Sequence, residues 1–225
     1  MHRRRRTALA LSAATLVAAP LLSACGSEAH PGAAAVVGGD RIDVATVQAQ
    51  AADVRTAQQE SEKSEELVAK SGQLTRVKLS GLIFGRVLDR AAKDAGVSVS
   101  RKEVQQIRSD AAVQSGGEEG VRTLMLEQRW VAPGQIEASL RQEVQLQKLA
   151  QALGADLQSP TGVQAVGESL TGASKALHIE VNPRYGSWDN KKVQLSTYKA
   201  PVDHPGHPRA GPGPPGRRLT RPVHG

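Results

Sequence analysis

The chain is poor in the residues from which most catalytic and disulfide-bonded proteins are built. Its 225 residues include one cysteine and one phenylalanine, and aromatic residues make up 2%. A single cysteine excludes an internal disulfide. No histidine lies between Val44 and Ala176 to act as a base or a zinc ligand, and no nucleophile elbow or phosphate-binding glycine loop is present. The sequence therefore predicts a protein that is not an enzyme and that uses no cofactor and no metal.

The body of the chain lacks a net positive charge, although the formal net charge of the whole sequence is +7. Arg3 to Arg6 contribute four of these charges, and the segment after Ala200 contributes a net of three. Residues 25–200 are consequently balanced, so the charge pattern gives no support for a nucleic-acid surface. We expect no nucleic acid among the partners.

The first 25 residues have the pattern of a bacterial lipoprotein signal. Four arginines precede an apolar run from Ala8 to Leu22, and Leu22-Ser23-Ala24-Cys25 follows. The run is shorter than the roughly 20 residues of a comfortable membrane-spanning helix, which favours an export signal. The alternative is an ordinary secretory signal that contains a cysteine, and the export route stays open between Sec and twin-arginine. We predict a signal peptide over residues 1–24, lipidation of Cys25 with diacylglycerol and palmitate, and a location on the extracytoplasmic face of the cell membrane.

The mature chain is expected to be mainly helical. After a small tether over residues 25–35, Asp43 is the predicted N-cap of a helix that runs to about Ser71. In this helix, Gln58 to Glu66 has no apolar stripe and is interpreted as a solvated helix or a loop outside the core. Four further helices and a weaker sixth follow from apolar spacing and from their end signals: Leu74 to Ala95, Ser100 to about Ser115, a short one after Gly117, Pro133 to Gly154, and one from Ser159 interrupted by Gly162, Gly167 and Gly172.

Two segments have strand character. Val36 to Ile42 carries Gly and Asp at its centre and is interpreted as a small hairpin, with more linker as the alternative. Leu177 to Asn182 alternates between apolar and polar residues, as a half-buried strand does. Because a lone strand needs a partner for its backbone groups, we expect the two segments to pair. Residues 190–225 are rich in Pro, Gly and Arg and are predicted to form a disordered tail.

The order of these elements resembles a known family. Val36 to Ile42 followed by a helix is similar to the start of the SurA and PrsA extracytoplasmic chaperones. The block Ala92 to Ser100 with its capping box, and the stretch Leu124 to Leu153, resemble that family's next segments. Asn182 to Asp189 is similar to the closing motif of actinobacterial lipoproteins of this type. The resemblance implies a mainly α fold over residues 36–189: a SurA N-terminal-like helical domain with a small β element formed by the N-terminal hairpin and the C-terminal return strand.

The resemblance also implies a function, namely a chaperone or foldase accessory that binds unfolded or newly exported polypeptides. Many members carry a parvulin prolyl isomerase domain, but only Ser159 to Ala176 lie where that domain is expected. A prolyl isomerase and a structural lipoprotein that docks one partner remain alternatives. Apolar residues that are candidates for client binding, with plain core packing as the other interpretation of each, are Leu82, Ile83, Val87, Leu124, Met125 and Leu126.

Overall fold

A small antiparallel sheet joins the beginning of the folded chain to its end. The computed structural model describes residues 32–196. Strands β1 (Ala33–Val37) and β2 (Asp40–Asp43) form a hairpin across Gly38-Gly39, whose φ angles of +61° and +88° suit a two-residue turn. Strand β3 (Glu180–Val181) pairs with the other edge of β1. The predicted pairing of the hairpin with the return strand is thus confirmed.

The return strand is shorter than the sequence indicates. Leu177 caps the preceding helix, and His178 has a φ of +44°, so regular pairing is limited to β3. The peptide N–H of Gly38 donates to the carbonyl oxygen of Leu177 at 2.7 Å. A Cβ at Gly38 would lie 2.8 Å from a methyl group of Leu177. Glycine is therefore needed at position 38 for two reasons: it adopts the left-handed φ angle without strain, and it leaves room for the close approach of Leu177.

The expected boundaries of the domain, residues 36–189, are too narrow at both ends. Ala33, Ala34 and Ala35 were assigned to the tether, but they lie in β1 and are buried. At the other end, strands β4 (Ser187–Asp189) and β5 (Gln194–Ser196) form a second hairpin, and β5 lies beyond residue 189, within the predicted disordered tail. Leu195 packs against the buried cluster next to the sheet. The predicted signal peptide and the rest of the predicted tail lie outside the described residues.

The first predicted helix is in fact two. Helix α1 (Val44–Gln59) has Glu60 as its C-cap, and α2 (Ser64–Lys70) begins after a short turn. The continuous helix to Ser71 is wrong because the polar run around Glu60 offers no side chain that would bury a further turn. Within that run Gln58 is completely buried, which corrects the expectation that the whole run lies outside the core.

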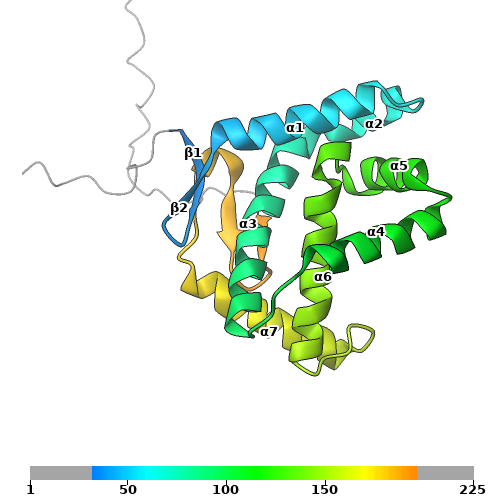
Figure 1. Cartoon of the computed structure of the whole chain (residues 1–225). Coiled ribbons are helices and arrows are strands. Elements are labelled where there is room, and N and C mark those ends of the chain that lie inside the picture. The colour runs from blue at the N-terminus through cyan, green and yellow to red at the C-terminus, as the bar shows by residue number, and fades with distance from the viewer. Residues whose placement is uncertain (1–31, 197–225) are drawn as a thin grey trace, which may run out of the picture. The chain divides into compact units, whose positions relative to one another are not determined.

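Helix α3 (Leu74–Asp94) lies at the centre of the fold, as its wide apolar face predicts. Leu74, Leu79, Ile83 and Leu88 are fully buried, each contributing about 1.5–3 kcal/mol. Helices α4 (Arg101–Ser115), α5 (Glu118–Arg129), α6 (Ile136–Ala152) and α7 (Pro160–Ala176) follow α3 in the chain. In Figure 1, α3 passes between the strands β1 and β2 and the helices α4, α5 and α6, and α7 crosses near its lower end. Among residues 32–196, no helix is long and apolar enough to cross a membrane.

The start of α4 has the capping box that its sequence predicts. The Ser100 hydroxyl accepts from the N–H of Glu103, and the Glu103 carboxylate accepts from the Ser100 N–H at 2.7 Å. Lys148 of α6 donates to the same carboxylate. These contacts lower the pKa of Glu103 to about 2, and the hydrogen bond from Lys148 contributes most to the change. The box therefore also ties α4 to α6.

Helix α7 is longer and more regular than its glycines suggest. The Ser159 hydroxyl caps it by accepting from the N–H of Gly162, and Pro160 occupies its first turn. Gly162 is buried, and a Cβ there would meet the carbonyl oxygen of Asp156 at 2.0 Å. Tertiary packing of Val166 and its neighbours on α3 overrides the low helix propensity of these glycines.

Candidate functional site

The structure separates the six residues predicted to bind clients. Ile83 and Val87 are fully buried, and Met125 and Leu126 are 3% and 8% exposed. These four are core residues, which corrects their assignment to an accessible surface: Ile83 packs in the cluster beneath β1 and β2, and the other three pack in clusters between helices. Only Leu124, at 38% exposed, and the half-buried Leu82 are accessible to a partner. Cys25, the predicted lipidation site, lies outside the described residues.

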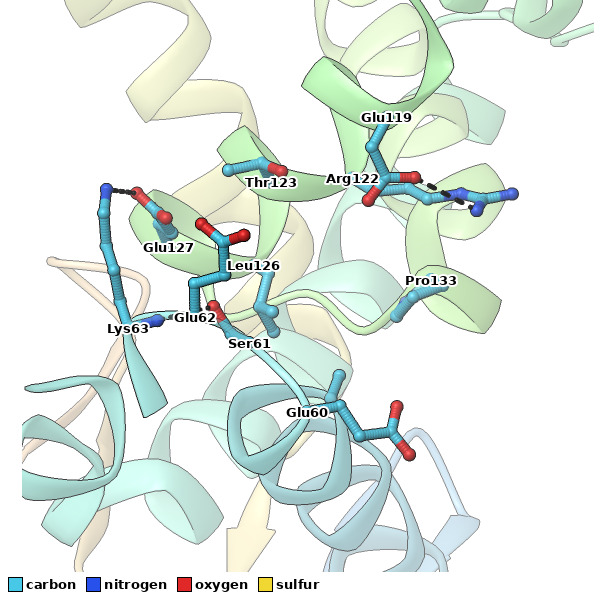
Figure 2. Close-up of a pocket in the computed structure, with 11 residues that line it drawn as sticks. Glu60, Ser61, Glu62, Lys63, Glu119, Arg122, Thr123, Leu126, Glu127 and Pro133 are labelled. Atoms are coloured by element: carbon cyan, nitrogen blue, oxygen red, sulfur yellow. Dashed lines mark hydrogen bonds and ion pairs between the residues drawn. The ribbon is translucent and has the colours of Figure 1, made fainter. Parts of the chain in front are cut away.

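One cleft, of about 660 Å³, lies between the α1–α2 turn and α5. Figure 2 shows side chains of the turn facing those of α5, with Leu126 directed into the space between them. Lys63 donates to Glu127 at 2.9 Å, and Arg122 pairs with Glu119 at 3.4 Å. We call this space the α5 cleft.

The α5 cleft has more acidic than basic groups on its walls. Glu60, Glu62, Glu119 and Glu127 line it, against Lys63 and Arg122. The hydrogen bond from Lys63 to Glu127 raises the pKa of that lysine. Because both cations already have carboxylate partners, the lining leaves a surplus of negative charge exposed to solvent. Such a surface repels acidic segments and attracts basic ones.

A second cleft, of about 310 Å³, lies where α1, α3 and the start of α6 meet. Its central group is Lys78 of α3, which is 9% exposed. The Lys78 ammonium donates to Oε1 of Gln135 at 2.7 Å, and Nε2 of Gln135 donates to the carbonyl oxygen of Gln50 at 2.9 Å. Leu82, one of the two accessible client-binding candidates, also lines this space. We call it the Lys78 cleft.

Burial changes the acid–base behaviour of Lys78. Desolvation lowers its pKa from 10.5 to about 8, and Asp53 opposes the change only in part. The group therefore stays mostly protonated at neutral pH while lacking the hydration that a surface lysine has. Sequence reasoning missed this residue, although a signal existed: Lys78 lies four positions from both Leu74 and Leu82, in the middle of the apolar stripe of α3.

A third polar feature lies at the end of α1. Gln58 is fully buried, and neither its Nε2 nor its Oε1 has a hydrogen-bond partner. An unpaired buried amide costs about 1–3 kcal/mol of stability. Gln145, by contrast, is buried on α6 and donates to Asp89 at 3.0 Å. The sequence does not distinguish these two glutamines, since their partners depend on tertiary packing.

The described residues also fall short of the requirements of a metal site. In the part that the structure describes, no group of three or more His, Cys, Asp or Glu residues is placed to hold a metal ion. His178 is exposed next to β3. Both clefts are lined by a mixture of polar and apolar side chains.

Comparison with known proteins identifies the family. The family model for the SurA-like N-terminal domain matches residues 1–150. No curated protein and no solved structure matched the chain. The match covers most of the chain and agrees with the mainly helical fold and its small antiparallel strands. The chain belongs to the family of proteins with a SurA-like N-terminal domain.

Proposed function

We propose that this protein is a lipid-anchored chaperone or foldase accessory that binds unfolded polypeptides on the extracytoplasmic face of the membrane. The observation that carries the proposal is the SurA-like N-terminal domain, because such domains are associated with binding unfolded polypeptides. The two clefts support it. Both lie between helices, and both combine charged groups with apolar walls, as a surface that accepts varied segments must.

Client binding is tested with the purified full-length protein and a chemically denatured reporter protein diluted into buffer. We expect a several-fold excess to suppress aggregation measured by light scattering. An equal amount of an unrelated helical protein is the control. Scattering that is the same with both proteins contradicts the proposal. A pull-down dominated by a single partner favours a structural lipoprotein instead.

Binding without catalysis is the second part of the proposal. We expect isomerisation of a proline-containing peptide to proceed at the uncatalysed rate in the presence of the protein, because the chain between α6 and β3 has room for one helix and not for an added catalytic domain. A rate above background that scales with protein concentration contradicts this.

Lipid anchoring rests on the arginines, the apolar run and the cysteine of the first 25 residues. Stable attachment needs more than one acyl chain, which a diacylglycerol-modified Cys25 supplies. We expect metabolic labelling with a palmitate analogue to mark the wild-type protein. The Cys25→Ser variant should incorporate no label and should no longer be recovered in the membrane fraction. A labelled Cys25→Ser protein contradicts the assignment of this residue.

A further inference from the structure

The Lys78 cleft contains a charged donor that the protein does not use fully. An ammonium has three N–H donors, and Lys78 uses one of them, toward Oε1 of Gln135. Within residues 32–196, no carboxylate forms an ion pair with Lys78. Asp53, the nearby acid, lies 3.5 Å from Nε2 of Gln135 and faces that amide. A buried cation thus keeps two donors available beside an open space.

The orientation of Gln135 explains why Lys78 has a neutral hydrogen-bond partner in place of a carboxylate in direct contact. The amide group of Gln135 is held by the carbonyl oxygen of Gln50, so its oxygen must face Lys78. The partner is therefore a neutral acceptor, which stabilises an ammonium less than a carboxylate does. An anionic oxygen that enters the cleft would supply the missing charge.

The walls of the cleft suit a polypeptide that carries such an oxygen. The side chains of Gln50, Ser139 and Gln142 line it, and within residues 32–196 they have no hydrogen-bond partner. Amide and hydroxyl groups pair with peptide N–H and C=O groups whatever the sequence. Val77, 42% exposed, and Leu82 add an apolar wall.

Charge favours an acidic occupant over a basic one. The two charged residues on the lining are Lys78 and Arg129, and Arg129 already pairs with Glu143 at 2.8 Å. The volume of about 310 Å³ lies near the lower limit of ligand pockets, about 300–1,000 Å³. It admits a short stretch of chain and excludes a folded partner.

We propose that the Lys78 cleft binds a carboxylate of a client polypeptide, with the Lys78 ammonium as its partner and Gln50, Ser139 and Gln142 pairing with the adjoining peptide groups. This inference rests on the proposed function and names the part of a client that the site recognises. The carboxylate comes from the end of a chain or from an acidic side chain within it, and the two sources share the same chemistry.

The test uses three fluorescent peptides of one neutral sequence with the full-length protein. The first ends in a free carboxylate, the second in a carboxamide, and the third in a carboxamide with one internal aspartate. By fluorescence anisotropy, we expect at least one carboxylate peptide to bind about tenfold or more tightly than the neutral peptide. Whichever of the two binds identifies the source. Equal binding of all three, or no binding, overturns the proposal.

Two variants test the site itself. Lys78→Met keeps the apolar stem and should remove the preference for a carboxylate. Gly81→Leu should block the cleft without disturbing the helix, because a Cβ at Gly81 meets no atom within 4 Å. The matched control is Gly172→Leu on α7, where a Cβ also meets no atom within 4 Å; it should bind as the wild type does. Circular dichroism checks that each variant folds.

The outcomes separate this inference from the proposed function. If Lys78→Met and Gly81→Leu keep the carboxylate preference, the inference is wrong even where the protein still suppresses aggregation. If the preference is lost in both and kept in Gly172→Leu, the cleft is the carboxylate site. The aggregation assay on the wild type decides the proposed function independently.

Discussion

The two ends of the described domain differ in how completely they bury and pair their side chains. At the sheet end, made of β1 to β5 and the part of α3 packed on them, Ala34, Leu79 and Ile83 are fully buried. At the helical end, made of residues 58–70 with α4 and α5, Gln58 is buried without a partner, and Val113 and Leu124 are 85% and 38% exposed.

Figure 1 shows these two ends at opposite ends of α1. The sheet end closes the chain on itself around a buried apolar cluster, so it supplies a stable base. The helical end tolerates an unpaired amide and exposed apolar groups, and of the four carboxylates that line its cleft only Glu119 and Glu127 form ion pairs with lining cations. The difference suggests that stability and adaptability are divided between the two ends.

Truncation of one leucine at each end is the strongest test of this comparison. Leu79→Ala should lower the free energy of unfolding by about 2–5 kcal/mol, because it leaves a cavity in a closed core. Leu124→Ala should cost about 0.5 kcal/mol or less, since its side chain is partly in solvent. Urea unfolding followed by circular dichroism measures both. Equal losses would remove the distinction between the two ends.

Replacing the unpaired amide of Gln58 at the helical end should give the next largest change in the free energy of unfolding. Unlike the leucine truncations, this change is an increase. Gln58→Met should raise the free energy of unfolding by about 1–2 kcal/mol, because it removes buried polar atoms that have no partner. Gln145→Met is the control and should lower it, since Gln145 donates to Asp89. A destabilised Gln58→Met would show that Gln58 has a polar partner in solution.

The capping box marks where the helical end joins α6. Ser100→Ala removes the cap of α4 and should cost about 1 kcal/mol. Hydrogen exchange should increase in the first turn of α4 and remain unchanged in β1. Ser98→Ala, which alters an exposed serine two positions earlier, should leave both unchanged. Faster exchange in β1 after Ser100→Ala would mean that the two ends open together.

Alkaline pH should produce the smallest change in the free energy of unfolding. This change comes from the titration of Lys78, which lies between the two ends. Burial lowers its pKa to about 8 in the folded state, from 10.5. Between these values the unfolded chain binds more protons, so the free energy of unfolding should rise with pH there, by about 1 kcal/mol after screening by solvent. Below pH 8 both states are protonated and the cost of burying the charge is fully present. Lys78→Met should lack this rise; a variant with the same slope contradicts it.

Some helix ends and the hairpin turn were predicted correctly, because each depends on a few residues that are adjacent in the sequence. Ser100 with Glu103, Gly96 after α3 and Gly38-Gly39 in the hairpin are short patterns with a direct physical cause, and the structure confirms each. The pairing of β1 with β3 followed from counting strands, because an isolated strand leaves its backbone groups unpaired.

Features that depend on distant contacts were missed. The β4–β5 hairpin has three-residue strands, too short for an alternating pattern to stand out, and it is held by Leu195 and Trp188 packing on residues far along the chain. The Lys78 cleft required knowledge of where Gln135 lies, 57 positions away. The same holds for the four core residues taken for client-binding candidates, since an apolar stripe does not show which neighbour covers it.

The pairing of β1 with β3 also bears on how the chain folds. The Asn182 side chain donates to the carbonyl oxygen of Ala33, 149 positions earlier. The chain is made from its N-terminus, so the hairpin precedes that partner by almost the whole domain, and its second edge is covered only when the distant chain end is in place. Contacts of such high sequence separation are slow to form, since a large loop must be closed first. Until then the unpaired edge of β1 is open to other strands, which makes the final step of folding also the step at which this protein is itself most prone to aggregate.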